Sequence, residues 1–505
     1  MEAGRRMLEQ ELKLSVEGAF APAVPPGAAE VSGIEELRAL DLRATYYDTP
    51  DLRLARHGVT LRSRTGEGSG DAGWCVKLPV GNGIAEGRDE ITYGGTGRTV
   101  PPAASDLLTA LVRSSTLTPV ARLRTRRRRW RLSDDDGTEI AELVDDRVSV
   151  LQHGRVTERF REIEIEGRGI DRERLERIAG IVARNGVEPT EQIPKLMRAL
   201  GSRASAPPDV VVPDGLRPSD PAATAVRAAI ARGVRRIVMN DPRTRLGEIE
   251  PLHQMRVGTR RLRSDLRTFH ELVDPDWAAS LRADLKWLGA ALGGVRDLDV
   301  LLERLRESGE GLDPHLEGLF EMLEARREVA RERLLGVLRS PRYVTLLDRL
   351  VEAAAAPPLT AIADAPSRDV LPPLVRRSWK KLARAGRKLG DASPDEDFHE
   401  VRKRAKQARY AAEAVAPAIG TARGRQAKCF AEAAADLQDV LGDLQDSVVA
   451  KEAIEPFTAD GDHPPEVTFA AGRLFERQDR AHMRCRSDHA AVWYRLDRSK
   501  RREWM

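Results

Sequence analysis

The sequence predicts an α+β protein with two modules: an N-terminal antiparallel β-barrel tunnel with flanking helices, and a C-terminal all-α helical bundle with an internal two-fold repeat. Three observations predict this organisation. Residues 1–200 contain short segments in which apolar and charged residues alternate, as in half-buried antiparallel strands. Residues 201–221 carry five prolines and no regular period, which is typical of a linker. Residues 222–500 consist of long stretches rich in alanine, leucine and arginine with helical period.

Composition narrows the classes of protein to consider. With 505 residues the chain is too long for one hydrophobic core, and 41% hydrophobic and 32% charged residues are typical of a globular protein. We find no apolar signal-peptide stretch and no run of transmembrane length, so we expect a cytoplasmic protein without a membrane partner. The cysteines, Cys75, Cys429 and Cys485, lie far apart and match no metal or redox spacing, which fits a reducing compartment.

The distribution of charge indicates the kind of partner. A net charge of +4 hides strong segregation, because arginines gather in clusters and glutamates in short alternating runs. Clustered arginine favours a polyanion such as nucleic acid, a phosphate chain or acidic lipid. Aromatic residues make up only 4% of the chain, which argues against a platform for stacking bases.

Charged residues in the first module are sorted by strand. Because alternate residues of a strand share a face, Glu9, Glu11 and Lys13 point the same way. The same rule groups four further sets on single faces: Glu162, Glu164 and Glu166; Arg62 and Arg64; Arg127 and Arg129; and Lys77 with Cys75. A solvent-exposed face also alternates in this way, but the separation of acidic strands from basic strands favours a shared interior. A closed barrel of about eight strands can hold a ligand inside, so we expect a tunnel with acidic and basic walls.

A tunnel of this kind suits a linear phosphate chain. Arginine and lysine hold phosphate oxygens by charge-assisted hydrogen bonds. Carboxylates repel the same oxygens unless a cation lies between them, and Mg²⁺ or Mn²⁺ prefers hard oxygen ligands from both sides. The sequence therefore predicts Mg²⁺ or Mn²⁺ as cofactor and a metal-assisted hydrolysis of a phosphoanhydride.

Several residues of this module allow two interpretations. The run 126–129 does not reveal which parity faces inward; we expect Arg127 and Arg129 inside and Trp130 outside, the alternative being a basic surface patch. For two further acids, Glu90 and Asp146, the sequence allows either metal ligation or a salt bridge.

Neither histidine of the first module has a metal-like partner nearby in sequence. His57 and His153 are therefore expected to be ordinary surface residues. We also find no nucleophilic triad in this module.

The second module contains a repeat. HQMRVGTRRLR begins at His253 and HEVRKRAKQAR begins at His399, and both have basic residues three, seven and ten positions further on. Each is followed by Leu-Gly-x-x-(Arg/Gln)-Asp, which ends at Asp297 in the first copy and at Asp446 in the second. Two matched features at similar separation indicate an internal duplication, with copies at about 222–355 and 374–500.

On a helix these offsets place the basic residues on one stripe, within an arc of about 80°. The two stripes and the preceding helix of the second copy supply the expected polyphosphate-binding residues: His253, Arg256, Arg260 and Arg263; His399, Arg402, Lys406 and Arg409; and Lys381 with Arg384. The alternative is a solvated helix face. Stacked like charges repel, so repetition of the stripe favours an anionic partner. Asp297 and Asp446 are expected either to orient arginines or to cap helix ends.

The first module resembles the CYTH family of triphosphate tunnel metalloenzymes over about residues 7–200. The resemblance is carried by Glu9-x-Glu11-x-Lys13, which matches the family's ExExK signature, and by YYDTPDLRLARHGVTLRSR from Tyr46, WCVKLP and FREIEIEG. It implies metal ligation by Glu9, Glu11, Glu162 and Glu164, with Asp146 added here, and makes Glu9, Glu11 and Lys13 the expected catalytic residues. It implies phosphate binding by Lys13, Arg62, Arg64, Lys77, Arg127, Arg129 and Lys195. Lys195 follows Pro194, where the family usually has serine.

The second module resembles the CHAD family over about residues 221–500. The match rests on HQMRVGTRRLR, on LGGVRDLDVLLERL and on the weaker second copy. It implies a helical bundle with a basic, pseudo-two-fold pore or groove that binds inorganic polyphosphate. We expect the histidines to donate hydrogen bonds to phosphate, because two histidines without carboxylates at ligand spacing make a poor metal site.

Taken together, the two resemblances imply hydrolysis of inorganic triphosphate or short polyphosphate in the tunnel, polyphosphate binding by the helices and association with polyphosphate granules. One alternative is a non-catalytic, granule-associated binding protein, although both acidic pairs are present. A second is chemistry on thiamine triphosphate or a nucleotide, for which no set of ring-binding residues is evident. Nucleic acid is the least favoured partner, because the sequence contains no recognition motif for it.

Overall fold

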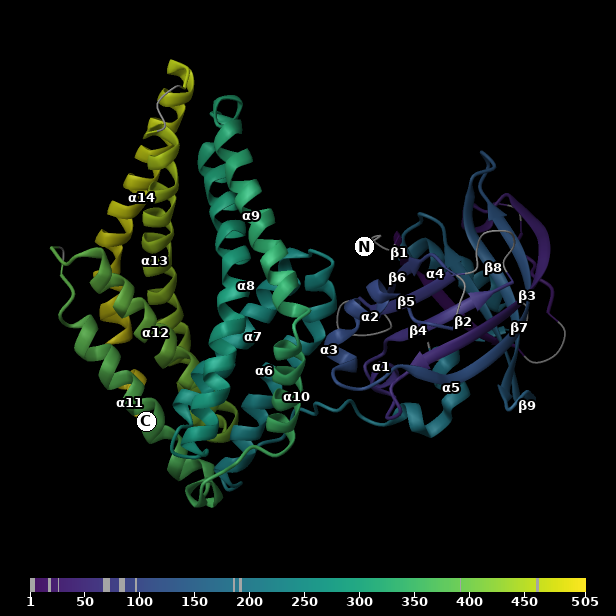
Figure 1. The fold of residues 1–505 in the computed structure, drawn as a ribbon, viewed down its shortest axis with the longest axis horizontal. Helices are drawn as coiled ribbons and strands as arrows, with labels where there is room; N and C mark the ends of the chain where they lie inside the picture. The colour runs from purple at the N-terminus through teal and green to yellow at the C-terminus, as the bar shows by residue number, and fades with distance from the viewer. Residues whose placement is uncertain are drawn as a thin grey trace. The chain divides into compact units, whose positions relative to one another are not determined.

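The computed structural model describes residues 5–16, 20–25, 27–66, 73–80, 87–95, 98–184, 187–189, 193–390, 392–459 and 463–505, with the side chains of residues 8, 9, 187–189 and 313 excepted. The chain forms two compact units, Met1–Asp209 and Val210–Met505. The first is an antiparallel sheet with helices and the second is all-helical (Figure 1), as the sequence predicts. Among the helices within these ranges, none is long and apolar enough to cross a membrane.

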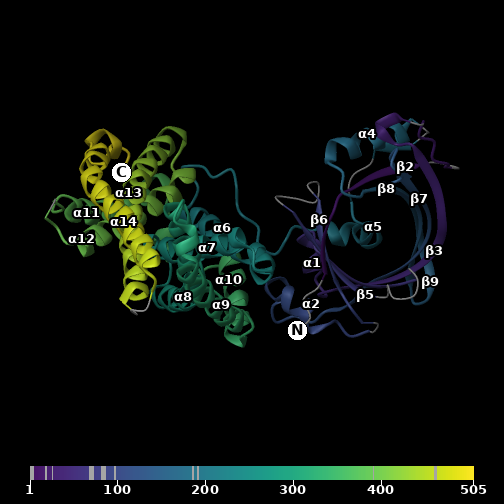
Figure 2. The same ribbon diagram turned by 90° about the horizontal axis from the view of Figure 1, so that it is seen from above.

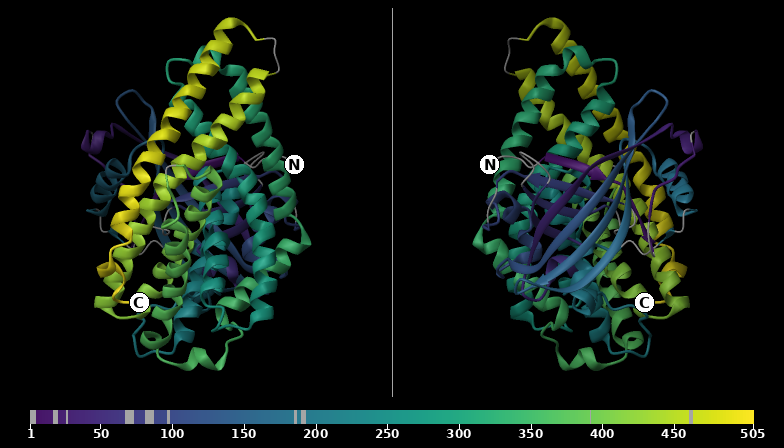
Figure 3. Two further views of the ribbon diagram at one scale, coloured as in Figure 1. Left: turned by 90° about the vertical axis from the view of Figure 1, so that its left-hand side faces the viewer. Right: turned by 90° about the vertical axis from the view of Figure 1, so that its right-hand side faces the viewer.

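The first unit is built on one sheet of ten strands. Their bounds are β1 Arg5–Glu9, β2 Glu11–Val16, β3 Gly33–Asp48, β4 Thr60–Thr65, β5 Gly73–Pro79, β6 Arg88–Tyr93, β7 Thr118–Ser133, β8 Glu139–Gln152, β9 Arg155–Gly167 and β10 Val187–Pro189. The long strands β3, β7, β8 and β9 lie side by side in that order and pair antiparallel, with a local register shift in each pair (Figure 3, right).

The strand order brings the two sides of this sheet together. The order is β1-β6-β5-β4-β3-β7-β8-β9-β2-β10. Only Gln10 separates β1 from β2, yet β1 pairs with β6 and β2 pairs with β9. The N-terminal segment therefore connects opposite sides of a curved sheet, which Figure 2 shows curling around an interior that contains α5 (Lys195–Leu200).

Alternation along the strands separates an apolar outer face from a charged inner one. Trp130, Leu143 and Ile165 point outward into a core that also contains Leu175 and Ile178 of α4 (Arg172–Ala183). Burying such side chains contributes roughly 1.5–3 kcal/mol each, which fixes the parity of β7, β8 and β9. The charged residues between them consequently face the interior.

A second apolar cluster lies at one end of the interior. Leu196 of α5 packs there with Tyr46, Leu123 and Val148 from the long strands. This packing holds α5 against the sheet, so that Lys195, its first residue, is carried into the interior. The remaining helices of the first unit are short: α1 Arg53–Arg56, α2 Pro102–Leu107 and α3 Thr109–Val112.

The proline-rich stretch 201–221 is less extended than a free linker. Its first part forms a 3₁₀ turn, Gly201–Ser205, with Ala204 buried in the apolar cluster around α5. Asp209 accepts a hydrogen bond from Arg113 and contacts His57 Nε2 at 2.9 Å. His57 accordingly has a polar partner and little exposed side chain, and it is not the ordinary surface residue expected from the sequence.

The second unit consists of nine α-helices within the described ranges. The first repeat contributes α6 Ala222–Arg245, α7 Ile249–Thr268, α8 Pro275–Gly309, α9 Glu317–Leu338 and α10 Pro341–Ala355; the second contributes α11 Ser367–Gly386, α12 Asp395–Val415, α13 Thr421–Ala459 and α14 Pro465–Leu496. In each repeat a shorter basic helix, α7 or α12, packs on the first helix of a long hairpin, α8–α9 or α13–α14 (Figure 1).

The two repeats also contact each other. Helix α7 packs on α12, and the two long hairpins share an apolar core that includes Leu305, Leu319, Ile454 and Leu474. Since α7 and α12 carry the two basic stripes, their contact brings the matched halves of the repeat to one place.

Candidate functional site

The interior of the first unit holds a cavity of about 540 Å³. Inward positions of β2, β4, β5, β6, β7, β8 and β9 line it, together with the start of α5. The lining includes seven residues expected from the sequence, Glu11, Lys13, Arg62, Arg64, Lys77, Glu164 and Lys195, and both inward arginines of β7, Arg127 and Arg129. Trp130 lies on the other face of the sheet, in the core against α4.

Carboxylates and cations interleave on one wall around Glu164. Lys13 Nζ lies 2.7 Å from Glu164 Oε1, and Lys195 Nζ lies 2.7 Å from Glu164 Oε2. The guanidinium of Arg127 donates two hydrogen bonds to Asp146, at 2.8 and 2.7 Å, and a third to Glu164 at 3.3 Å. Each carboxylate is thus held in a fixed direction by cations from other strands.

Strand register creates this wall. Lys13 stands opposite Glu164 in the β2–β9 pair, and Glu11 stands opposite Glu166. In the β8–β9 pair Asp146 stands opposite Glu162, and in the β7–β8 pair Arg127 stands opposite Asp146. Residues from β2, β7, β8 and β9 therefore meet on one wall of the cavity, at successive inward positions along β9.

The cations keep the buried acids ionised. Burial raises the pKa of Glu164, but Lys13, Lys195 and Arg127 outweigh it and hold that pKa well below its usual range. Asp146 behaves in the same way, because Arg127 and Lys195 overcome its burial and lower its pKa. Burial lowers the pKa of Lys195, yet its acidic neighbours raise it well above normal. Both the carboxylates and the cations of this wall are therefore charged at neutral pH.

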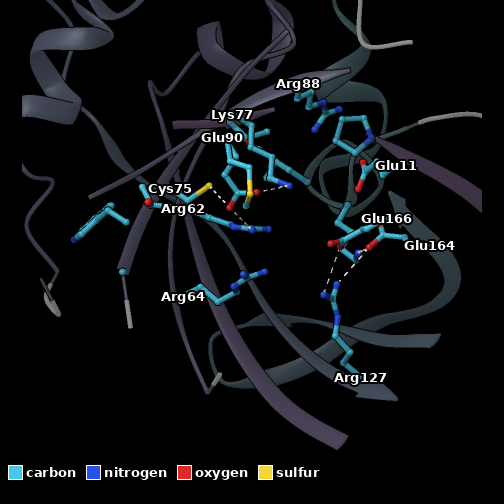
Figure 4. Close-up of a pocket in the computed structure, with 18 of the residues that line it drawn as sticks. Glu11, Arg62, Arg64, Cys75, Lys77, Arg88, Glu90, Arg127, Glu164 and Glu166 are labelled. Carbon is cyan, nitrogen blue, oxygen red and sulfur yellow. Dashed lines mark hydrogen bonds and ion pairs between the residues drawn. The ribbon is translucent and has the colours of Figure 1, made fainter. Parts of the chain in front are cut away.

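The opposite wall is mainly basic (Figure 4). Glu90 lies 3.5 Å from Arg62 Nη2 and 3.4 Å from Lys77 Nζ, and it accepts a hydrogen bond from the thiol of Cys75. Burial raises the pKa of Glu90, but Lys77 and Arg62 lower it overall. Burial raises the pKa of the Cys75 thiol to about 12, so the thiol stays protonated. Glu90 is thus a salt-bridge partner that orients two cations.

Three carboxylates are close enough to share a cation. Ligand oxygens of Glu11, Glu164 and Glu166 lie within 4.8 Å of one another. Glu162 and Asp146, which were also expected to bind metal, lie behind this group with 1% and 0% of their side chains exposed, and each faces Lys195 at 2.8 and 2.9 Å. The side chain of Glu9 lies outside the described part of the structure. An oxygen-only donor set fits Mg²⁺ or Mn²⁺.

Sequence reasoning missed several lining residues. Glu166 was grouped with Glu162 and Glu164 by parity, but it was not named as a ligand. Arg88 lies in the cavity wall with 5% of its surface exposed, and its Nε and Nη2 atoms have no hydrogen-bond partner among the described residues. It shares a strand face with Glu90, so parity within RDEITY could have found it. Glu142 and Arg168 pair at 2.7 Å and extend the lining further.

In the helical unit, the two stripes have equivalent contacts. Arg256 donates hydrogen bonds to Asp297 at 2.6 Å and to the carbonyl of Gly293 at 3.3 Å. Arg402 lies 3.9 Å from Asp446, and a Cβ on Gly442 would lie 3.4 Å from its Nη2 atom. The shared Leu-Gly-x-x-(Arg/Gln)-Asp pattern therefore provides a glycine that admits the arginine and an aspartate that orients it.

Four cations from the two repeats converge where α7 meets α12. Burial lowers the pKa of Lys406 to about 7, and nearby Arg260, Arg402 and Arg256 add to this effect. Arg260 also lies over the ring of Tyr410, with its guanidinium carbon 5.6 Å from the ring centroid. The pKa values of His253 and His399 are lowered by burial and then by neighbouring cations. The group Arg256, Arg260, Arg402 and Lys406 is called the central cluster below.

Two further predicted residues belong to α11 and not to the central cluster. Lys381 and Arg384 are exposed on α11. Arg384 lines a separate hollow of about 230 Å³ together with Asp397, Glu400 and Arg404. Their role in binding an anion stays a prediction.

Comparisons with known proteins agree with these two parts. The model of the CYTH domain matches residues 7–192, and that of the CHAD domain matches residues 228–455. The uncharacterized protein Rv2226 of Mycobacterium tuberculosis is 32% identical over 525 residues, covering 98% of this chain and 98% of that protein.

Two solved structures resemble the chain in part. PptA from Streptomyces chartreusis is 22% identical, with a TM-score of 0.46, over 54% of this chain and 99% of that one. The CHAD domain from the plant Ricinus communis is 25% identical, with a TM-score of 0.44, over 56% of this chain and 95% of that one.

Proposed function

Because the chain belongs to the proteins that join a CYTH domain to a CHAD domain, we propose that its tunnel hydrolyses inorganic triphosphate or short polyphosphate and that its helical unit binds polyphosphate. CYTH domains are triphosphate tunnel enzymes that depend on a metal, so the proposal concerns the particular substrate and the residues that act on it. It includes a cytoplasmic location and association with polyphosphate granules through the helical unit.

One observation carries the catalytic part of the proposal. The cavity has three carboxylates within reach of one cation on one wall, and Arg62, Arg64, Lys77 and Arg88 elsewhere in its lining. A phosphate chain between the walls satisfies both sets at once, because its oxygens bind the arginines and lysines directly and reach the carboxylates through metal ions. Aromatic residues in the lining are buried at 8% exposure or less, which favours a substrate without a ring.

Glu11, Glu164 and Glu166 are the proposed metal ligands, together with Glu9, Glu162 and Asp146 from the sequence prediction. A bound Mg²⁺ or Mn²⁺ would supply charge neutralisation at phosphoryl oxygens and a water of lowered pKa. Lys13 and Lys195 keep the carboxylates ionised and correctly directed through their contacts with Glu164.

The cations of the opposite wall bind and orient the substrate. Glu90 contacts both Arg62 and Lys77 and orients them in the cavity lining. Arg88 has buried donor atoms without partners among the described residues. Leaving such donors unpaired costs roughly 1–3 kcal/mol, and a phosphate oxygen would remove that cost. Arg127 and Arg129 complete the proposed substrate-binding set.

The helical part of the proposal rests on the central cluster. The cations of the central cluster repel one another, and the burial of Lys406 adds to this cost in free energy. A linear polyanion offsets both effects with charge-assisted hydrogen bonds. The phosphate groups of polyphosphate are regularly spaced anions on a flexible chain. They can therefore contact hydrogen-bond donors that are distributed along α7 and α12.

The test is phosphate release by the full-length protein from inorganic triphosphate, short polyphosphate, ATP and thiamine triphosphate, with Mg²⁺, with Mn²⁺ and with a chelator. We expect release that depends on a metal and is fastest for inorganic triphosphate or short polyphosphate. Glu11→Gln should abolish most of it, whereas Glu36→Gln, at an exposed side chain on the outer face of the sheet, should not. Equal release by the wild type and Glu11→Gln would remove the catalytic assignment, and a preference for ATP or thiamine triphosphate would replace the substrate.

A further inference from the structure

The two halves of the helical unit are equivalent in fold but not in charge. Arg263 on α7 and Arg409 on α12 occupy the same place in the repeat, ten residues after the histidine. Their neighbours on the following helix are also equivalent: Gly289 on α8 and Gln438 on α13 lie four residues before the matched glycines, Gly293 and Gly442. The surroundings of Arg263 and Arg409 can therefore be compared directly between the two halves.

In the first half, Arg263 is surrounded by other cations. A Cβ on Gly289 would lie 3.9 Å from its Nη1 atom, so the adjacent helix presents no polar side chain there. Burial lowers the pKa of Arg263, and Arg267 and Arg282 lower it further. Among the described residues, no hydrogen bond or ion pair is found for Arg263, Arg267 or Arg282.

In the second half, acids from the protein itself occupy the same place. Arg409 donates a hydrogen bond to Glu413 at 2.8 Å and another to Gln438 at 3.3 Å. Burial lowers the pKa of Arg409, but Glu413 raises it overall, and Asp439 contributes in the same direction. The anionic partner that Arg263 lacks is thus built into the chain beside Arg409.

The sequence of the repeat explains the difference. Where the first half has Arg267, the second has Glu413; where α8 has Ala290 and Gly294, α13 has Asp439 and Asp443. Arg282 of α8 corresponds to Ala431 of α13. Asp443 in turn lies 3.9 Å from Arg304, so these aspartates extend an acidic face along α13 toward the neighbouring hairpin.

We propose that polyphosphate binds asymmetrically, running from the central cluster along Arg263, Arg267 and Arg282 of the first half, while in the second half Glu413 neutralises Arg409 and Asp439 and Asp443 repel the chain. This inference rests on the proposed polyphosphate binding and adds a direction to it. The bound chain gains unpaired arginines in one direction and meets repelling carboxylates in the other.

The first experiment compares equivalent arginines in the full-length protein. Binding of a polyphosphate of defined length is measured by calorimetry for Arg263→Ala and Arg409→Ala, with thermal unfolding as the check on folding. Loss of a charge-assisted hydrogen bond predicts about a tenfold weaker Kd for Arg263→Ala. Contrary to the sequence-based expectation that Arg409 binds polyphosphate, Arg409→Ala should change Kd by less than about twofold, because Glu413 already neutralises this arginine. Equal losses, or a larger loss for Arg409→Ala, would overturn the asymmetry.

A second experiment removes the acidic barrier. Asp439→Ala gives α13 the residue that α8 has at this position, and Glu321→Ala on the exposed face of α9 makes the same change in net charge as a matched control. We expect Asp439→Ala to tighten binding about threefold more than Glu321→Ala does. An equal effect of the two variants would show a general charge effect and contradict an exclusion by Asp439.

The wild-type protein separates the two levels of the proposal. If it binds no polyphosphate in this assay, the proposed function of the helical unit fails. If it binds and both arginine variants lose affinity equally, that function stands and only the direction fails.

Discussion

The tunnel and the helical surface both collect arginine and lysine, but they balance the charge differently. In the tunnel nearly every inward cation faces a carboxylate from another strand, as Lys195 does with Asp146, Glu162 and Glu164. In the central cluster, Lys406 lies near three arginines, and burial together with these neighbours lowers its pKa to about 7. The tunnel is thus internally neutralised, whereas the central cluster has more cations than acids, because Asp297 and Asp446 pair only with Arg256 and Arg402.

This difference teaches what each unit requires from a ligand. A neutralised wall gains little from an anion alone, because the anion must displace carboxylates unless metal ions accompany it. A cluster with an excess of cations gains from a matching polyanion and requires no metal. Metal dependence should therefore distinguish the tunnel, and dependence on ionic strength should distinguish the helices.

Glu164→Gln tests the tunnel side of the comparison with the largest expected effect. The change removes a proposed metal ligand and the carboxylate that holds Lys13 and Lys195, so triphosphate hydrolysis should fall by about 100-fold. Polyphosphate binding by the helical unit should stay unchanged. Phosphate release at saturating substrate and calorimetric Kd measure the two effects.

Glu158→Gln is the matched control, because Glu158 lies on the same strand with an exposed side chain. Its hydrolysis rate should equal that of the wild type. A drop of less than about threefold for Glu164→Gln would mean that this carboxylate does not contribute to the reaction, and the contrast between the two units would lose its basis.

Ionic strength tests the helical side. Raising monovalent salt from about 0.05 M to 0.2 M at constant Mg²⁺ should weaken polyphosphate binding about tenfold, since the bound anion replaces counterions at several cations. The rate of triphosphate hydrolysis at saturating substrate should change less than about twofold, because the tunnel charges are buried and paired. Equal sensitivity of both measurements would contradict the distinction.

Much of this arrangement follows from local sequence pattern. Parity placed charged residues on one face of each strand, and the separation of acidic from basic strands favoured a shared interior. The structure places Glu11, Lys13, Arg62, Lys77 and Glu164 in the cavity lining. The repeated offsets of the two basic helices likewise follow from helical period. These properties depend on neighbours in sequence, so a single chain suffices to find them.

Depth along the tunnel could not be predicted in the same way. Parity groups Glu162, Glu164 and Glu166 but does not say which of them meets Glu11. The register of β2 on β9 decides this, because it sets Glu11 opposite Glu166. In the other direction, the pairing of β8 with β9 sets Glu162 opposite Asp146 in the buried layer next to Lys195. Register is a long-range property that alternation within one strand does not contain.

Long-range contacts also explain the other differences. His57 lacks a partner nearby in sequence, and its partner Asp209 belongs to the proline-rich stretch that was expected to be a linker. Gln438 and Asp439 have no special pattern in sequence. They become informative only when α13 lies beside Arg409 and is compared with α8 beside Arg263.

The pH dependence of polyphosphate binding gives the smallest expected effect and bears on the central cluster alone. Lys406 has a pKa of about 7, lowered first by burial and then by Arg260, Arg402 and Arg256. A polyanion binds the protonated amine better, so affinity should be highest below pH 7 and should fall about threefold as the pH rises to 8. The neighbouring histidines, His253 and His399, have lowered pKa values and lose their protons at lower pH.

The variant Lys406→Arg separates this lysine from ionisation of the ligand itself. An arginine stays protonated over the whole range, so the decline between pH 6 and pH 8 should become shallower in the variant while any change due to the phosphate chain stays. Calorimetric titrations at three pH values measure both proteins. A decline of the same size in the wild type and in Lys406→Arg would mean that Lys406 is already fully charged, which would require a partner acid and would make the central cluster as neutralised as the tunnel.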